Sequence, residues 1–158
     1  MLLDGQSDDF IFEFDANLTV RDTNTSSGLD EGTDTLINIE QIDFSDGSHT
    51  EIGTNSQGLV LGFFDDAEAP VSVRTVFDTA DAFNWAGYTQ TFADDGTTLT
   101  DRETVFDDGR VLNVDYVDGI RSSRVMTDVA DVYSWSSYMQ DFDVNGVLIS
   151  TTYFDDIA

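Results

Sequence analysis

DTADAFNWAGYTQTFADDG at residues 78–96 recurs as DVADVYSWSSYMQDFDVNG at residues 128–146. The offset is 128 − 78 = 50 residues, and 8 of the 19 aligned residues are identical. Arg74 and Arg124 match at the same offset. Self-similarity at a fixed period is the signature of a tandem structural repeat, so the second half of the chain is predicted to contain two copies of one structural unit.

The end of the repeat is less regular. VFDD at residues 105–108 matches YFDD at residues 153–156 with an offset of 153 − 105 = 48, which predicts a two-residue deletion in the second copy. The second copy then stops at Ala158, before any counterpart of residues 110–119, as it would at the edge of a fragment.

Each copy has the pattern of an antiparallel β-meander. Asp-Gly and Asn-Gly pairs favour tight hairpin turns, and they separate stretches rich in β-branched and aromatic residues. Leu112, Val114 and Tyr116 alternate with polar residues, which is the period of a half-buried strand. The segments 78–85 and 128–135 each predict a short helical turn, because Asp is a good N-cap. The expected turns are residues 94–96, 107–109, 118–119 and 145–146, and the expected strands include residues 97–106 and 110–117.

On either side of this stretch, the sequence predicts three segments in an all-β chain. Residues 1–58 are rich in Asp, Gly, Thr and Asn. Residues 59–73 form a connection, with an apolar run at 59–64 that predicts a buried strand and with the only proline, Pro70, near its end. Residues 74–158 hold the two copies of the repeat.

The composition excludes several classes of function. The 158 residues include 26 Asp, 6 Glu, 6 Arg and no Lys, for a formal net charge of -26, so the chain lacks the basic surface that nucleic acids and anionic membranes require. A content of 40% hydrophobic and 12% aromatic residues still predicts a folded chain. One His and no Cys leave zinc almost without ligands, whereas Asp-rich turns favour hard cations such as Ca²⁺.

No stretch is long and apolar enough to predict a membrane helix, and the first residues lack the apolar core of a signal peptide. If the protein is exported, we expect its signal to lie elsewhere.

Two stretches of the first segment resemble RTX, or haemolysin-type calcium-binding, repeats. Residues 4–12, DGQSDDFIF, resemble a degenerate copy of the G-G-x-G-x-D-x-U-x nonapeptide. Residues 32–36, GTDTL, repeat its second half and run into NIEQIDFSDG at 38–47, which is similar to the segment that closes many RTX arrays. The resemblance implies a parallel β-roll that binds Ca²⁺ between rungs, with Ile11 and Leu36 facing its interior.

The same resemblance implies the candidate calcium ligands. Each ion in such a roll is shared by neighbouring rungs, so Asp9 and Asp34 would supply half-sites unless the fold pairs them, and Asp8, Asp43 and Asp46 are weaker candidates. The alternative is that these carboxylates are solvated turn residues that bind no ion.

The third segment is similar to the YD repeats of large surface proteins. An aromatic-Asp-x-x-Gly pattern occurs at residues 106–112 and 142–148 and less well at 92–96. Together with the 50-residue unit, the chain resembles the C-terminal extensions of secreted RTX proteins of marine bacteria. That resemblance implies an extracellular protein exported by type I secretion, for which the absence of Cys is suitable.

Both copies contain W-x-x-Y followed by Gln, which predicts a carbohydrate-binding surface. Sugar rings pack on aromatic rings, while amides form hydrogen bonds with sugar hydroxyls. The alternative is that the aromatic residues form the core of the repeat. The candidate residues are Trp85, Tyr88, Gln90, Trp135, Tyr138 and Gln140.

Other motifs favour simple structural roles. Residues 141–146, DFDVNG, match the start of an EF-hand loop, but Thr152 stands where the bidentate Glu is needed, so an Asn-Gly hairpin is the better interpretation. His49 follows a turn and has no nucleophile motif near it. Nothing in the sequence indicates catalysis.

We therefore expect an all-β chain, with a short RTX-like β-roll remnant followed by tandem repeats that form an antiparallel β-meander or a sandwich-like unit. The expected function is a non-catalytic accessory module of a secreted protein, with calcium-assisted folding and polysaccharide binding. The alternatives are a structural or adhesive module for protein contacts or self-association and, third, a fragment of a polysaccharide-active enzyme. The sequence leaves the oligomeric state open.

Overall fold

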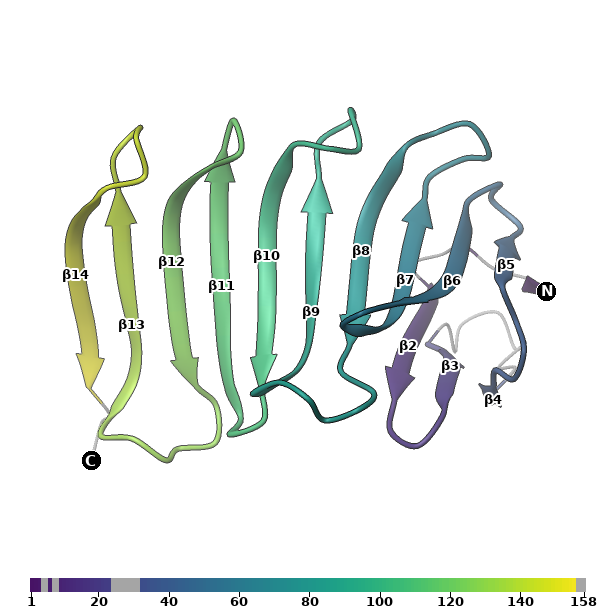
Figure 1. Ribbon diagram of the computed structural model, residues 1–158, viewed down its shortest axis with the longest axis horizontal. Coiled ribbons are helices and arrows are strands. Elements are labelled where there is room, and N and C mark those ends of the chain that lie inside the picture. The colour runs from purple at the N-terminus through teal and green to yellow at the C-terminus, as the bar shows by residue number, and fades with distance from the viewer. Residues whose placement is uncertain (4–5, 7–8, 24–31, 156–158) are drawn as a thin grey trace.

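The chain forms two β-sheets, one of 11 strands and one of three (Figure 1). This computed structural model describes residues 1–3, 6, 9–23 and 32–155. The large sheet contains, in spatial order, β1 (Leu2–Leu3), β5 (Gln41–Phe44), β6 (His49–Asn55), β7 (Gly58–Phe64), β8 (Val71–Phe77), β9 (Trp85–Phe92), β10 (Leu99–Phe106), β11 (Arg110–Val117), β12 (Ile120–Asp128), β13 (Trp135–Phe142) and β14 (Leu148–Asp155). The small sheet contains β2 (Phe10–Phe14), β3 (Leu18–Asp22) and β4 (Thr33–Thr35).

The large sheet is a meander in which each strand from β5 to β14 pairs antiparallel with the next. The all-β class and the antiparallel meander are therefore confirmed. The predicted apolar strand at 59–64 is β7, in which Leu61 is fully buried. Among the described residues, no helix is long and apolar enough to cross a membrane.

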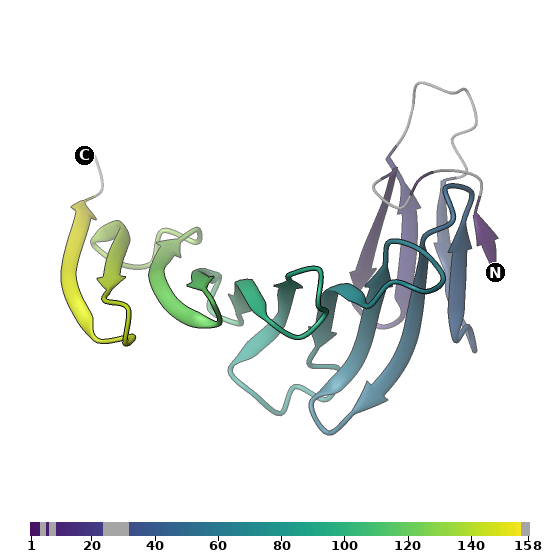
Figure 2. The same ribbon diagram turned by 90° about the horizontal axis from the view of Figure 1, so that it is seen from above.

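The small sheet packs on one face of β5–β8 (Figure 2). Alternate residues of β2 point toward the large sheet, and the ring centroids of Phe12 and Phe63 lie 5.5 Å apart. Phe14 similarly contacts Phe77, with centroids 6.0 Å apart. The buried core between the two sheets consists of Leu3, Phe10, Leu18, Val20, Leu36, Ile42, Phe44 and Leu61.

The described part of residues 1–50 does not form the expected parallel β-roll. β2, β3 and β4 pair antiparallel, and the parallel pairing present is that of the two-residue β1 with β5. Leu36 is buried as expected, but the prediction for Ile11 was wrong, since its side chain is 42% exposed. Phe10 and Phe12 occupy the inner face of β2, so strand alternation turns Ile11 outward.

Beyond the small sheet, the large sheet continues as a single layer (Figure 2). No described strand packs on either face of β10–β14. The second half of the chain therefore forms the expected antiparallel meander as a single layer, and sandwich-like packing is not present among the described residues.

The strand register corrects the predicted end of the repeat. Val105 pairs with Gly87, and Phe154 pairs with Ser137, so the third strands of the two copies are offset by 154 − 105 = 49 residues rather than 48. In the first copy the Ala93 N–H donates a hydrogen bond to the Thr98 carbonyl, five residues on. In the second copy the Asp143 N–H donates the equivalent bond to the Val147 carbonyl, four residues on. The second copy is thus one residue shorter, and the deletion lies in this turn.

The predicted turns are present, but the predicted helical turns are not. Asp118 and Gly119 both have positive φ values, of 52° and 74°, as a tight Asp-Gly hairpin requires. In the segments before β9 and β13, Asp81 and Asp131 adopt φ values of 50° and 54°, which no right-handed helix contains. The Asp78 carboxylate accepts the Phe83 N–H at 2.6 Å and stabilises an open turn instead.

Candidate functional site

The strand register assigns the side chains of β8–β14 to two faces, because directly paired residues share a face. We call one of them the arginine face. One of its rows consists, strand by strand, of Arg74, Gln90, Arg102, Val114, Arg124, Gln140 and Thr151. The neighbouring row on the same face consists of Val76, Tyr88, Thr104, Leu112, Met126, Tyr138 and Tyr153.

The structure brings the predicted carbohydrate-binding residues to this one face. Gln90 and Gln140 lie in the first row, and Tyr88 and Tyr138 lie in the second. Each tryptophan contacts its tyrosine edge to face, with centroids 5.2 Å apart for Trp85 and 5.3 Å apart for Trp135. The matched residues are four strands apart, which corresponds to about 19 Å across the sheet.

The two copies differ in the solvent exposure of these rings. In the first copy, Trp85 is 9% exposed and Tyr88 is 8% exposed, and both pack on the fully buried Val76. The Tyr88 hydroxyl donates a hydrogen bond to the Gln57 side-chain carbonyl at 2.8 Å. These two rings therefore form a small core, whereas Trp135 and Tyr138 in the second copy are only half-buried.

A second aromatic ring stacks on each tryptophan, and neither ring was among the predicted site residues. Phe83 lies 4.9 Å from Trp85 with an interplanar angle of 10°, and Tyr133 lies 5.2 Å from Trp135 at 13°. Each outer ring is 40% exposed. The sequence could have indicated these two rings, because an aromatic residue occurs at the same position of both copies, 50 residues apart.

Arginine side chains cover several aromatic rings of the face. The Arg102 guanidinium carbon lies 4.2 Å from the Tyr88 ring centroid, and that of Arg74 lies 5.3 Å from Phe92. Such cation–π contacts contribute about 0.5–1 kcal/mol each at exposed sites and more where water is excluded. The guanidinium groups thus cover part of the apolar surface that a second layer of strands would otherwise bury.

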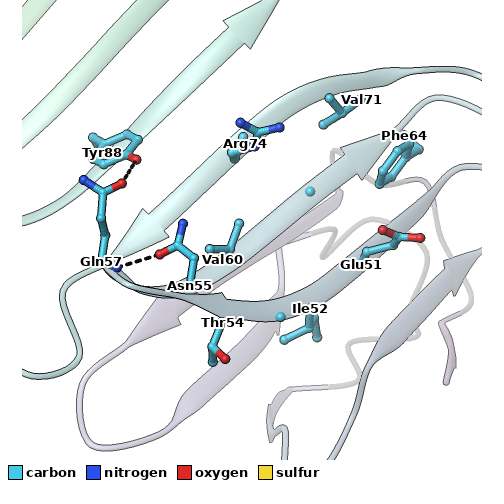
Figure 3. A pocket seen from close by; sticks show the side chains of 12 residues that line it. Glu51, Ile52, Thr54, Asn55, Gln57, Val60, Phe64, Val71, Arg74 and Tyr88 are labelled. Atoms are coloured by element: carbon cyan, nitrogen blue, oxygen red, sulfur yellow. Dashed lines mark hydrogen bonds between the residues drawn. The ribbon is translucent and has the colours of Figure 1, made fainter. Parts of the chain in front are cut away.

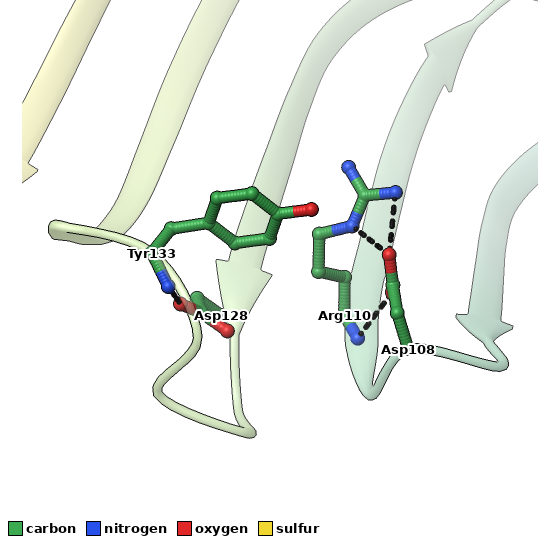
Figure 4. A network of polar contacts seen from close by, with 4 residues as sticks. All are labelled: Asp108, Arg110, Asp128 and Tyr133. Atoms are coloured by element: carbon green, nitrogen blue, oxygen red, sulfur yellow. Dashed lines mark hydrogen bonds and ion pairs between the residues drawn. The ribbon is translucent and has the colours of Figure 1, made fainter.

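Arg110 connects the two copies through a polar network at the end of the face (Figure 4). Its guanidinium lies 5.4 Å from the Tyr133 ring centroid and forms an ion pair with Asp108 at 2.8 Å. The hydrogen bond with Arg110 lowers the pKa of Asp108, and the same bond raises the pKa of Arg110. The Asp128 carboxylate accepts the Tyr133 N–H, which holds the outer ring in place.

A groove of about 530 Å³ extends this face over β6–β9 (Figure 3). Gly53 and Gly62 line it without side chains, and Val60 and Val71 supply apolar surface. Charged and polar side chains also line it, namely Glu51, Asn55, Gln57, Arg74 and Tyr88.

The predicted calcium ligands are not brought together among the described residues. β3 lies between β4, which contains Asp34, and β2, which follows Asp9, so the two half-sites do not meet. Asp9 accepts the Gln6 N–H at 3.0 Å, and Asp43 accepts the Gln41 amide at 2.6 Å. Asp46 accepts the Ser48 N–H at 2.9 Å. Asp8 lies outside the described residues.

Among the described residues, no three Asp, Glu or His side chains form a group that could hold a metal ion. The aspartates of the predicted RTX segment therefore do not form a complete calcium site in the part of the chain described.

The other motifs have structural roles. Asp141 accepts the Ser150 hydroxyl at 2.7 Å, whereas Asp143 accepts the Asn145 and Val147 N–H groups, both at 2.9 Å. These bonds to Asp143 lower its pKa and support the predicted Asn-Gly hairpin. The His49 ring stacks on Phe64 with centroids 4.5 Å apart.

Comparison of the chain with protein-family models gives no match, and comparison with curated proteins gives no significant match. The arginine face and its aromatic rings are therefore the features from which we infer a function.

Proposed function

We propose that this chain is a non-catalytic, polysaccharide-binding accessory module of a secreted RTX-type protein. The observation that carries the proposal is the pair of matched aromatic stacks, Phe83 on Trp85 and Tyr133 on Trp135, with the outer rings partly exposed. The apolar face of a sugar packs on such rings, and nearby amides can form hydrogen bonds with its hydroxyls.

The spacing of the stacks favours a polymer over a single sugar. The two copies present equivalent residues about 19 Å apart across the same face. A chain that lies across β9–β13 contacts both stacks at once, and linking two weak sites raises the overall affinity. The groove over β6–β9 extends this path.

Affinity gel electrophoresis in a panel of neutral and acidic polysaccharides tests the proposal. We expect at least one polysaccharide to retard the protein. Phe83→Ala and Tyr133→Ala should reduce the retardation, whereas Val144→Ala, in an exposed turn, should not. Thermal melts establish that the variants are folded. Absence of retardation by every polysaccharide would contradict the proposal.

Calcium-assisted folding is the second part of the proposal, and the crowding of carboxylates supports it. Desolvation and then repulsion by Asp81, Asp78 and Asp108 raise the pKa of Asp107. Cations that bind the folded chain relieve such repulsion and stabilise it. Millimolar Ca²⁺ should therefore raise the melting temperature more than NaCl of equal ionic strength, and an unchanged midpoint would exclude this part.

A second candidate function, self-association, is favoured by β14. This strand pairs with β13 on one side and with no described strand on the other, and Ile149, Tyr153 and Phe154 are 67%, 64% and 48% exposed. An antiparallel pairing of two copies centred on Thr151 places Ile149 opposite Tyr153 and keeps each face continuous. Exposed edge strands are templates for such pairing, and the charge of β14 is confined to Asp155 at its end.

Analytical ultracentrifugation tests self-association. The chain should form a dimer that Thr151→Lys dissociates, because lysine on an edge strand opposes pairing. Thr97→Lys, in a turn away from β14, is the control. A monomer at every concentration examined would exclude this candidate.

A further inference from the structure

The charges of the single-layer sheet are strongly separated between its faces. Arg110 shares the face of Leu112 and Val114 by strand alternation, and Arg121 pairs with Tyr116 on that face. Five of the six arginines of the chain therefore lie on the arginine face, namely Arg74, Arg102, Arg110, Arg121 and Arg124.

The acids of β9–β13 are distributed in the opposite way. Asp101, Glu103, Asp115 and Asp141 lie on the other face. Of the acidic residues in these described strands, one lies on the arginine face: Asp128, at the end of β12, which pairs with Arg110. A chain with a net charge of -26 thus has one locally cationic strip across the middle of this face.

Most of these guanidinium groups have no carboxylate partner. Among the described residues, Arg110 pairs with Asp108, but Arg74, Arg102, Arg121 and Arg124 form no ion pair. The Nε atom of Arg102 is buried without a hydrogen-bond partner, and that of Arg124 donates to the neutral Gln140 amide. With 32 acidic residues in the chain, ion pairing would have been readily available to these arginines.

The unpaired arginines are also regularly spaced. Arg74, Arg102 and Arg124 lie in one row and come from alternate strands, β8, β10 and β12. Alternate strands are about 10 Å apart. The row therefore presents a cationic group about every 10 Å, with aromatic rings beside it.

We propose that the arginine face binds an anionic polysaccharide, whose carboxylate or sulfate groups pair with the row of Arg74, Arg102 and Arg124. This inference rests on the proposed function and specifies its ligand class. Guanidinium groups recognise carboxylate and sulfate oxygens through directed hydrogen bonds, and the adjacent rings contact the sugar faces. The screening length of about 8 Å at physiological salt limits repulsion from acids elsewhere on the chain.

Binding to two pairs of polymers tests the inference, with the full chain in EDTA. The pairs are dextran sulfate with dextran, and polygalacturonate with its methyl ester, so each pair differs mainly in charge. We expect binding to at least one charged member, at least tenfold weaker binding to its neutral partner, and weakening by NaCl. The charged member that binds more tightly distinguishes sulfate from carboxylate recognition.

Substitutions connect the binding to the row. Arg124→Gln should weaken binding about fivefold, as expected for the loss of one charge-assisted contact. Arg124→Lys keeps the charge but not the planar donor geometry of the guanidinium, so its affinity should lie between those of the wild type and Arg124→Gln. Arg21→Gln is the matched control: it makes the same change in net charge on the small sheet and should have no effect. Thermal melts show whether each variant is folded, and Arg74→Gln provides an independent test if Arg124→Gln is unstable.

Several outcomes overturn the inference. Equal affinity for the charged and the neutral polymer of a pair would support polysaccharide binding but refute anion recognition. The same conclusion follows if charged polymers bind only with Ca²⁺ and Arg124→Gln has no effect, since calcium would then bridge carboxylates. Binding to none of the four polymers while another neutral glycan retards the protein also refutes it. Equal binding of single-stranded oligonucleotides would show a general polyanion surface instead.

Discussion

The two-layered part of the molecule, β1–β8, and its single-layer part, β10–β14, are joined by the continuous large sheet but are stabilised differently. In the first, the small sheet covers β5–β8, and residues such as Ile42 and Leu61 are fully buried. In the second, no described layer covers either face, and side chains are protected mainly by their neighbours on adjacent strands. β9 lies at the transition, with Trp85 and Tyr88 in a small cluster.

The comparison shows what a sheet needs when it has no second layer. Cross-strand contacts are then the main source of stability, and arginines lying on aromatic rings shield apolar surface while keeping a charge in water. The same arrangement leaves an open face with rings and guanidinium groups, which is the surface we propose for ligand binding.

The largest expected effect is in the two-layered core. Leu61→Ala should lower the free energy of unfolding by about 4 kcal/mol, because it leaves a cavity between two sheets. Leu112→Ala, on half-buried β11, should cost about half as much, since water and neighbouring side chains can fill the space. Urea denaturation followed by circular dichroism measures both values, and equal losses would contradict the distinction between the two parts.

The tryptophans provide a matched pair across the repeat. Trp85→Ala should destabilise the protein by about 3 kcal/mol, and Trp135→Ala by roughly half of that, because Trp85 is the more deeply buried. The remaining tryptophan reports unfolding by fluorescence in each variant. An equal or larger cost for Trp135→Ala would mean that burial does not account for the difference.

A smaller effect is expected from one guanidinium group. Arg102→Gln should destabilise the protein by about 1 kcal/mol through the loss of its contact with Tyr88. Arg21→Gln removes an exposed ion pair with Glu13 and should change stability by less than about 0.5 kcal/mol. Thermal unfolding at matched ionic strength compares them, and a negligible effect of Arg102→Gln would show that the contact does not stabilise the single layer.

The smallest expected effect is a pH dependence at the β9–β10 turn. The hydrogen bond from the Thr98 hydroxyl, together with the Thr98 and Thr97 N–H groups, lowers the pKa of Asp95 to about 2. A lowered pKa in the folded state means that the contribution to stability is complete above the ordinary value of about 4 and is lost as the pH falls toward 2. Asp95→Asn should therefore flatten the decline of the melting temperature in this range, and an unchanged slope would refute the assignment.

Much of the strand pattern could be predicted locally. Residues 110–117 were predicted as a strand and are β11, and the turn at Asp118 and Gly119 has the positive φ values that its sequence predicts. Alternation correctly placed Leu112, Val114 and Tyr116 together. The 50-residue repeat likewise places Arg74 and Arg124 at equivalent positions, each paired with a glutamine on the adjacent strand.

The candidate site was predicted less completely. The six carbohydrate-binding candidates lie together on or against one face, but Phe83, Tyr133 and Arg102 were not identified. The sequence of β11 did contain a signal for arginines on this face. Arg110 and Leu112 are two residues apart, so alternation places the Arg110 guanidinium on the same side as the apolar residues. The calcium candidates depended on a parallel roll, which antiparallel pairing of β2–β4 replaces in the described residues.

By itself, the sequence determined the strands, the hairpins and the tandem repeat, because these follow from side-chain alternation and from the backbone preferences of Asp, Asn and Gly over a few residues. Tertiary structure decided that the small sheet covers β5–β8 and stops there, and that five arginines meet on one open face. The physical reason is that coverage and register depend on packing and pairing between residues far apart in the chain, which no local pattern specifies.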